Sequence, residues 1–137
     1  MFTHQVSVPE PCRLRDCLMS LQLTGSGRVA VIAVSGEVDM TNAHLLSGFA
    51  ERALRDDPLR LVLDLANVRF LGAAGIRALL RIRAAVSAEA GQLLLRNPSR
   101  ITVTALTATR DIDRFQIHTT IATTTPRFDA VGEDSGR

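Results

Sequence analysis

The fold is decided by residues 59–65, Leu-Arg-Leu-Val-Leu-Asp-Leu, and by Gly-Ala-Ala-Gly at residues 72–75. The first run is short and mostly apolar, which is typical of a strand buried inside a sheet. The second precedes apolar residues at helical spacing, from about Ile76 to Glu89. We therefore predict a strand, a connection over residues 66–71, a tight turn, and a helix that begins at about Ile76.

The same alternation extends toward the N-terminus. The apolar and β-branched run Val29–Val34 predicts a second buried strand. A helix is expected after it, because Thr41 or Asn42 can cap an N-terminus and an apolar stripe follows. The alternating residues 17–23 predict an earlier strand, which a turn at residues 24–27 closes.

The pattern also continues toward the C-terminus. Residues 92–96 predict a strand, and Asn97-Pro98-Ser99 begins a third helix, with Ile101, Ala105 and Leu106 facing inward. A last strand is expected to begin at residues 115–117. A last helix is expected after Thr125-Pro126, because proline is favoured at the first helical position.

Strands that alternate with helices predict an α/β domain with a mixed central sheet of about four to five strands packed with helices. We expect an arm at residues 1–16, one domain at 17–131 and a tail at 132–137. Loops beyond the carboxyl ends of strands usually carry function in such sheets. Two loops qualify here, residues 35–42 and residues 66–75.

Composition excludes several classes of protein. The 137 residues suffice for one domain, and a hydrophobic share of 46% excludes disorder for most of the chain. The 16 basic residues are all arginine, and they exceed the 14 acidic ones by only two. They are scattered, and Trp and Tyr are absent, so nucleic acid is not an expected partner. No secretory signal and no apolar run of about 18 residues is present, so no membrane association is expected.

The two cysteines, Cys12 and Cys17, cannot form a disulfide framework, and no second pair completes a zinc site. They are interpreted as ordinary thiols of a reducing cytoplasm, with a regulatory pair as the alternative. We expect neither a metal nor a cofactor.

The glycines of residues 72–75 admit two interpretations. A helix N-terminus offers free amides to a phosphate group. However, a phosphate-binding loop of the Walker type needs a lysine, and the dinucleotide motif Gly-x-Gly-x-x-Gly is absent. A tight turn from strand to helix is therefore favoured over nucleotide binding.

Catalysis is not indicated either. His4, His44 and His118 are dispersed, and no Gly-x-Ser-x-Gly motif occurs. Asp39 and Asp64 follow or end strands and could form an acid–base pair, although such carboxylates more often cap helices or bind loop amides. The protein is therefore predicted not to be an enzyme.

A set of arginines follows the glycines. Arg77 and Arg81 lie one turn apart, with Arg83 nearby. The set is either a solvated helix face or a docking surface for an acidic partner.

Taken in order, Val34–Asp39, Leu61–Leu71, Gly75-Ile76 and Leu93–Ser99 resemble a STAS domain, the family of sulphate transporters and anti-sigma factor antagonists. The resemblance runs from about Leu18 to Val131. Without membrane spans, the chain is similar to the stand-alone bacterial antagonists.

The resemblance implies partner switching. An antagonist of this family binds an anti-sigma factor, a serine kinase of the histidine-kinase-like ATPase fold, and thereby frees a sigma factor for transcription. The kinase phosphorylates a hydroxyl at the start of the second helix, in a motif Asp-Ser-Ser-Gly or Asp-Ser-Thr-Gly. The added charge of about −1.5 to −2 at an interface weakens the complex.

The chain departs from this pattern at two places. The Asp-Ser-Ser/Thr positions fall on Gly72, Ala73 and Ala74, and no serine, threonine or tyrosine lies between Asn67 and Arg83. Near the third helix, Arg110-Asp111 replaces the family's usual glycine, with a shift of one residue.

Two interpretations remain. The first is an antagonist that binds its anti-sigma factor without phosphorylation at the usual site. The second is a divergent STAS scaffold that binds another regulatory protein or a small ligand. Either a monomer or a homodimer is compatible with the sequence. The residues expected to bind the partner are Gly36, Asp39, Thr41, Asn42, Gly72, Ala73, Ala74, Gly75, Ile76, Arg77 and Arg81.

Overall fold

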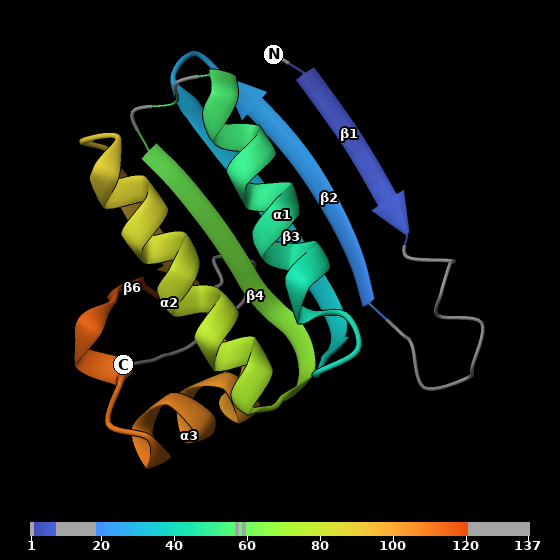
Figure 1. Cartoon of the computed structure of the whole chain (residues 1–137), viewed down its shortest axis with the longest axis vertical. Coiled ribbons are helices and arrows are strands. Elements are labelled where there is room, and N and C mark those ends of the chain that lie inside the picture. Colours follow the sequence, from blue (N-terminus) through green and yellow to red (C-terminus); the bar gives the residue numbers. More distant parts are fainter. Residues whose placement is uncertain (1, 8–18, 57, 59, 121–137) are drawn as a thin grey trace, which may run out of the picture.

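The computed structural model describes residues 2–7, 19–56, 58 and 60–120. Its helices and strands follow one another in the order drawn in Figure 1. They are β1 (Phe2–Ser7), β2 (Met19–Ser26), β3 (Val29–Val38), α1 (Ala43–Ala53), η1 (Leu54–Asp56), β4 (Arg60–Leu71), α2 (Ala73–Ala88), β5 (Gln92–Arg96), α3 (Arg100–Ala108), η2 (Ile112–Arg114) and β6 (Gln116–His118).

The predicted mixed α/β sheet is confirmed. Its six strands lie in the order β1-β2-β3-β4-β5-β6; the pairs among β1, β2 and β3 are antiparallel, and those from β3 to β6 are parallel. The arm expected at residues 1–16 contains β1, which pairs with β2 from Phe2 opposite Gly25 to Ser7 opposite Ser20. This edge strand brings the count of described strands above the expected four to five.

The helices α1 and α2 lie side by side over one face of the sheet (Figure 1). From β3 to β6, each new strand is added beside the preceding one and on the same side of it, so the sheet extends in one direction. Since crossovers between parallel strands are right-handed, such an order places successive helices on the same face. The helix α3 packs against β4.

The core lies between this face and the helices. Every second residue of β3 is buried, while its alternate residues are half-buried or exposed. This is the period expected when one face of a sheet is covered. The core side chains that are almost inaccessible to solvent include Leu21, Ile32, Val34, Leu46, Leu61, Leu63, Leu79, Ile82, Leu95 and Leu106.

The predicted connection over residues 66–71 is wrong, because β4 continues to Leu71. Its second half pairs with the end of β3, after two register shifts that let Val38 lie opposite Leu71. These irregularities break the alternation that would have indicated a strand. The helix α2 begins at Ala73 rather than at about Ile76, with Gly72 as its extended N-cap. Strand and helix are therefore separated by one residue.

The third helix begins after Ser99, whose hydroxyl accepts a hydrogen bond from the Thr102 amide at 3.3 Å. Leu106 is buried as predicted, but Ile101 is 45% exposed and Thr102 takes the inward position. Ala105 is partly buried against the core, so of the three residues expected to face inward only Ile101 is misplaced. The helix expected after Pro126, the tail, and both cysteines lie outside the described residues.

Candidate functional site

The two loops expected to carry function meet at the carboxyl end of β3 and β4. The amide of Gly72 donates to the carbonyl oxygen of Val38 at 3.0 Å. This bond joins the segment that leads into α1 to the segment that leads into α2. We call residues 39–42 and 70–77 together the carboxyl-edge surface.

Asn42 holds the first half of this surface in place. It is completely buried; its Oδ1 accepts from the amide of Asp39 at 3.0 Å, and its Nδ2 donates to the carbonyl oxygen of Glu37 at 2.9 Å. Asp39 in turn accepts hydrogen bonds from the amide of Thr41 at 2.9 Å and from its hydroxyl at 2.6 Å. The polar residues of this loop therefore bind one another and fix its shape.

The glycines at the start of α2 are explained by close packing. A Cβ atom on Gly75 would lie 2.5 Å from Cδ1 of Leu71 and 3.1 Å from Cγ1 of Val38, both in the core. A Cβ atom on Gly72 would lie 3.1 Å from the ring of Phe70. The tight turn, rather than a phosphate-binding loop, accounts for both glycines.

The residues predicted to bind a partner divide into two groups. Thr41, Ala73, Arg77 and Arg81 are exposed, and Asp39, Gly72 and Ala74 are partly exposed, whereas Gly36, Asn42, Gly75 and Ile76 are buried. Gly36 has a φ of 95° beside a register shift of β3, a conformation that favours glycine. The buried group can only support the surface, and the exposed group is available for contact.

The three arginines of α2 do not form one patch. Arg81 Nε donates to Oε2 of Glu51 on α1 at 2.8 Å, and this hydrogen bond and the negative charge raise the pKa of Arg81. Arg83 Nε donates to the carbonyl oxygen of Arg114 at 2.7 Å, toward η2. Arg77 has no hydrogen bond or ion pair with any residue in the described ranges. Of these three side chains, only Arg77 makes no hydrogen bond or ion pair with a described residue, so it is the one whose charge is available to a partner.

Two apolar residues of the carboxyl-edge surface were missed by sequence reasoning. Met40 is 82% exposed and Phe70 is 47% exposed. Phe70 stood in the predicted connection, and Met40 stood in a loop without a motif. The one signal available for Phe70 was its position two residues before Gly72, whose missing side chain leaves room for the ring.

The proposed acid–base pair is not assembled. Asp64 Oδ2 accepts from Arg96 at 3.0 Å, and Asp64 Oδ1 accepts from the amide of Ala66 at 3.1 Å. Asp64 lies opposite Ala33, which is six residues before Asp39 along β3. At about 3.3 Å per residue, the backbone positions of Asp39 and Asp64 are therefore roughly 20 Å apart along the strand direction.

Within the described ranges, no group of three or more histidine, cysteine, aspartate or glutamate side chains could hold a metal ion. None of the described helices is both long and apolar enough to cross a membrane.

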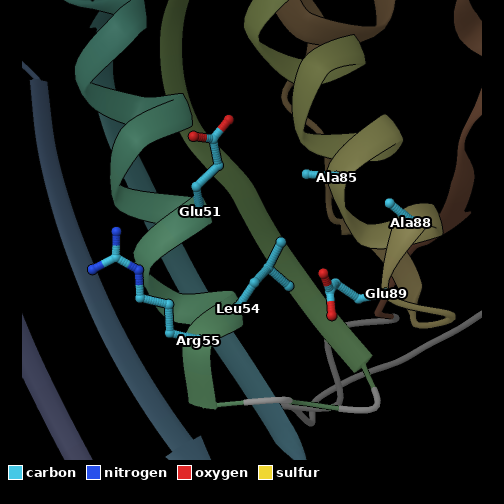
Figure 2. A pocket seen from close by; sticks show the side chains of 6 residues that line it. All are labelled: Glu51, Leu54, Arg55, Ala85, Ala88 and Glu89. Atoms are coloured by element: carbon cyan, nitrogen blue, oxygen red, sulfur yellow. The ribbon is translucent and has the colours of Figure 1, made fainter.

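An open groove lies at the other end of the helices, between the last turns of α1 and α2 (Figure 2). Its lining residues are Glu51, Leu54, Arg55, Ala85, Ala88 and Glu89. It is remote from Gly72 and Ala73, which begin α2, and it contains none of the residues predicted to bind a partner.

Comparison with known proteins gives the same fold. A crystal structure of an anti-sigma factor antagonist from Mycobacterium paratuberculosis matches with a TM-score of 0.65 and 28% identity, over 75% of this chain and 87% of that one. The anti-sigma factor antagonist SpoIIAA in its unphosphorylated form matches with a TM-score of 0.64 and 18% identity, over 74% and 88% of the two chains.

Sequence comparison points to the same group of proteins. The anti-sigma-F factor antagonist RsfB of Mycobacterium tuberculosis is 41% identical over 64 residues, which are 47% of this chain and 49% of that protein. The chain thus spans about half the length of the curated relatives it matches. The model of the STAS domain family matches residues 20–124. With most of its length matched by that model and its fold shared with those structures, the chain belongs to the STAS domain family.

Proposed function

We propose that this protein is an anti-sigma factor antagonist, which binds an anti-sigma factor through the carboxyl-edge surface and thereby frees a sigma factor. The observation that carries the proposal is the hydrogen bond between Gly72 and Val38, which unites the two predicted loops into one surface. The antagonist names of the RsfB relatives support it. No enzymatic activity is part of this function, and we place it in the bacterial cytoplasm, where sigma factors act.

The partner is proposed to be a serine kinase that cannot modify this protein at the usual position. Ala73 is exposed on the first turn of α2, where the family's pattern places a hydroxyl. Its methyl group is small and neutral, so it resembles an unmodified serine in size and charge. The surface therefore stays in its binding form whatever the activity of the kinase.

The residues proposed earlier for partner binding keep distinct roles in this function. Thr41, Ala73 and Arg77 contact the partner. Asn42 and Gly75 act indirectly, since both are buried beneath the surface and fix the backbone that carries the contacts. Arg81 contributes less than expected, because Glu51 already binds its guanidinium.

The test uses purified protein mixed with each anti-sigma kinase of the source organism, with and without ATP. We expect co-elution with one kinase in both conditions and no phosphate on this protein by mass spectrometry. A family member that carries Asp-Ser-Ser-Gly is the control, and it should be released once ATP is added. Failure to bind any of the kinases would refute the antagonist function.

The loss of the phosphoacceptor motif also favours a second candidate, a divergent STAS scaffold that binds another regulatory protein or a small ligand. A small enzyme that uses Asp39 and Asp64 is a less favoured alternative, because each of the two carboxylates already binds a separate local partner. Native mass spectrometry tests the ligand-binding form of this candidate, which predicts a retained small molecule, whereas the antagonist predicts the mass of the chain alone or of its dimer. A scaffold for another regulatory protein is distinguished by the kinase-binding test above, in which it binds no anti-sigma kinase.

A further inference from the structure

Among the phenylalanine and methionine side chains whose burial the structure describes, two are exposed, and both lie on the carboxyl-edge surface. Phe49 and Phe115 are 7% and 9% exposed, and Met19 is 3% exposed. Phe70 and Met40 are 47% and 82% exposed. Single exposed apolar residues are common and need no explanation. Two large exposed apolar residues, each two positions from the same backbone hydrogen bond, do call for an explanation.

Phe70 is held in position by the missing side chain of Gly72. Ring atoms of Phe70 lie 3.1 and 3.4 Å from the place where a Cβ atom of Gly72 would be, so the ring packs over the glycine. A ring supported in this way loses little conformational freedom when a partner covers it, and a low entropic cost favours binding.

Met40 lies near enough to act with Phe70. Each is two residues from one end of the hydrogen bond between Val38 and Gly72. Four residues and one hydrogen bond span at most roughly 20 Å. One side of a standard interface covers about 800 Å², or roughly 30 Å across if it is circular. Both side chains therefore fit within a single footprint.

Arg77 adds an uncommitted positive charge one turn beyond Ala73. It has no ion pair with any described residue, whereas Arg69 lies 4.0 Å from Glu37 and Arg81 binds Glu51. Phenylalanine, methionine and arginine are enriched in interface cores relative to the remaining surface. Phe70, Met40 and Arg77 are of these residue types, and all three lie on the carboxyl-edge surface.

We propose that Phe70 and Met40 are the anchors of the partner interface and that Arg77 orients it. The fitting partner presents an apolar cleft for the two side chains and a carboxylate opposite Arg77. This inference rests on the proposed antagonist function and names the side chains that supply its affinity. Burial of the Phe70 and Met40 side chains then supplies the affinity of the complex, and no phosphorylation at Ala73 can weaken it.

The test measures the affinity of the full chain for its anti-sigma factor by calorimetry. We expect Phe70→Ser and Met40→Ser each to weaken binding by about tenfold or more, as is typical of interface anchors. Arg77→Gln should weaken binding less, by about threefold to tenfold. The matched control is Ile101→Ser on α3, whose parent side chain is 45% exposed and should leave affinity unchanged.

Circular dichroism melting curves decide whether a variant is folded, and exposed positions should keep the melting temperature of the parent. The inference is overturned if the parent binds and the Phe70 and Met40 variants bind within twofold of the Ile101 control. If the parent binds no anti-sigma factor, the antagonist function itself fails and this inference fails with it. The two failures are therefore distinguished by the behaviour of the unmodified protein.

Discussion

Ala73 is the single residue on which the proposed regulation depends. It is the first residue of α2 and is exposed, next to the extended cap Gly72. We predict that Ala73→Asp weakens partner binding by about tenfold or more, because the new carboxylate brings a charge into the interface and pairs with Arg77, four residues later, in place of the partner. The fold should persist, since a carboxylate is favourable at a helix N-terminus. Calorimetry of Ala73→Asp beside the uncharged Ala73→Asn checks this, and equal affinities would exclude charge as the cause.

Asn42 is the second decisive residue, through structure rather than contact. Its side chain satisfies the amide of Asp39 and the carbonyl oxygen of Glu37 inside the protein. Asn42→Ala leaves these groups without partners, so it should lower the free energy of unfolding by about 1–3 kcal/mol. Thr41→Ala, one residue earlier and exposed, should cost clearly less in the same urea titration. A loss as large for Thr41→Ala would place the support of the loop in the Asp39–Thr41 contact instead.

At the scale of secondary structure elements, the joint between β4 and α2 has almost no spare room. A methyl group on Gly75 would meet Leu71 and Val38, so Gly75→Ala should lower the free energy of unfolding by about 1–3 kcal/mol through overpacking. Gly48→Ala is the matched control within α1, where the new methyl group meets only the tip of Arg52 at 3.9 Å. It should raise stability by up to about 1 kcal/mol, since alanine favours helix. Chemical denaturation of both variants would reveal the opposite signs.

The C-terminus of α3 carries a residue that local geometry disfavours. Arg110 has a φ of 63°, and the amide of the following Asp111 donates to Leu106 at 2.8 Å, as in a helix C-cap that usually contains glycine. Arg110→Gly should therefore raise the free energy of unfolding by about 1 kcal/mol. Thr109→Gly, at a φ of −93°, should bring no gain. Arg110 stands near the position where the resemblance to the STAS family implies a glycine, and its backbone adopts a conformation that favours glycine.

The elements could be predicted from sequence where their apolar period is regular, and not where a neighbour imposes the structure. Residues 92–96 were predicted with the observed bounds, because the strand is brief and bounded by turn residues. The extension of β4 to Leu71 depends on pairing with β3 through two register shifts, which leave no period in Asn67 to Phe70. The motif at residues 72–75 indicates where the proposed site lies, but the exposure of Phe70 and Met40 follows from packing that no local pattern encodes.

At the scale of the whole molecule, the net charge of +2 says little about the partner. Arg69 and Arg81, just outside the carboxyl-edge surface, form ion pairs with Glu37 and Glu51 on this chain, and the proposed anchors are apolar. We predict that raising ionic strength from about 0.1 to 0.5 M weakens partner binding by less than about tenfold. Titration of the complex in both buffers tests this, with random duplex DNA as a control that should not bind. A steeper dependence on salt would mean that arginine contacts, rather than Phe70 and Met40, dominate the complex.

The order of the strands has a consequence for how the protein is made. Each strand lies beside the one that precedes it in the chain, from β1 to β6. A ribosome therefore releases every strand next to a neighbour that has already emerged, and the sheet can grow from one edge without waiting for the C-terminus. Sequential contacts of this kind close shorter loops than a shuffled strand order would require. Pulling on a nascent chain stalled after β4 should find resistance from the β2–β3–β4 unit before β5 and β6 exist.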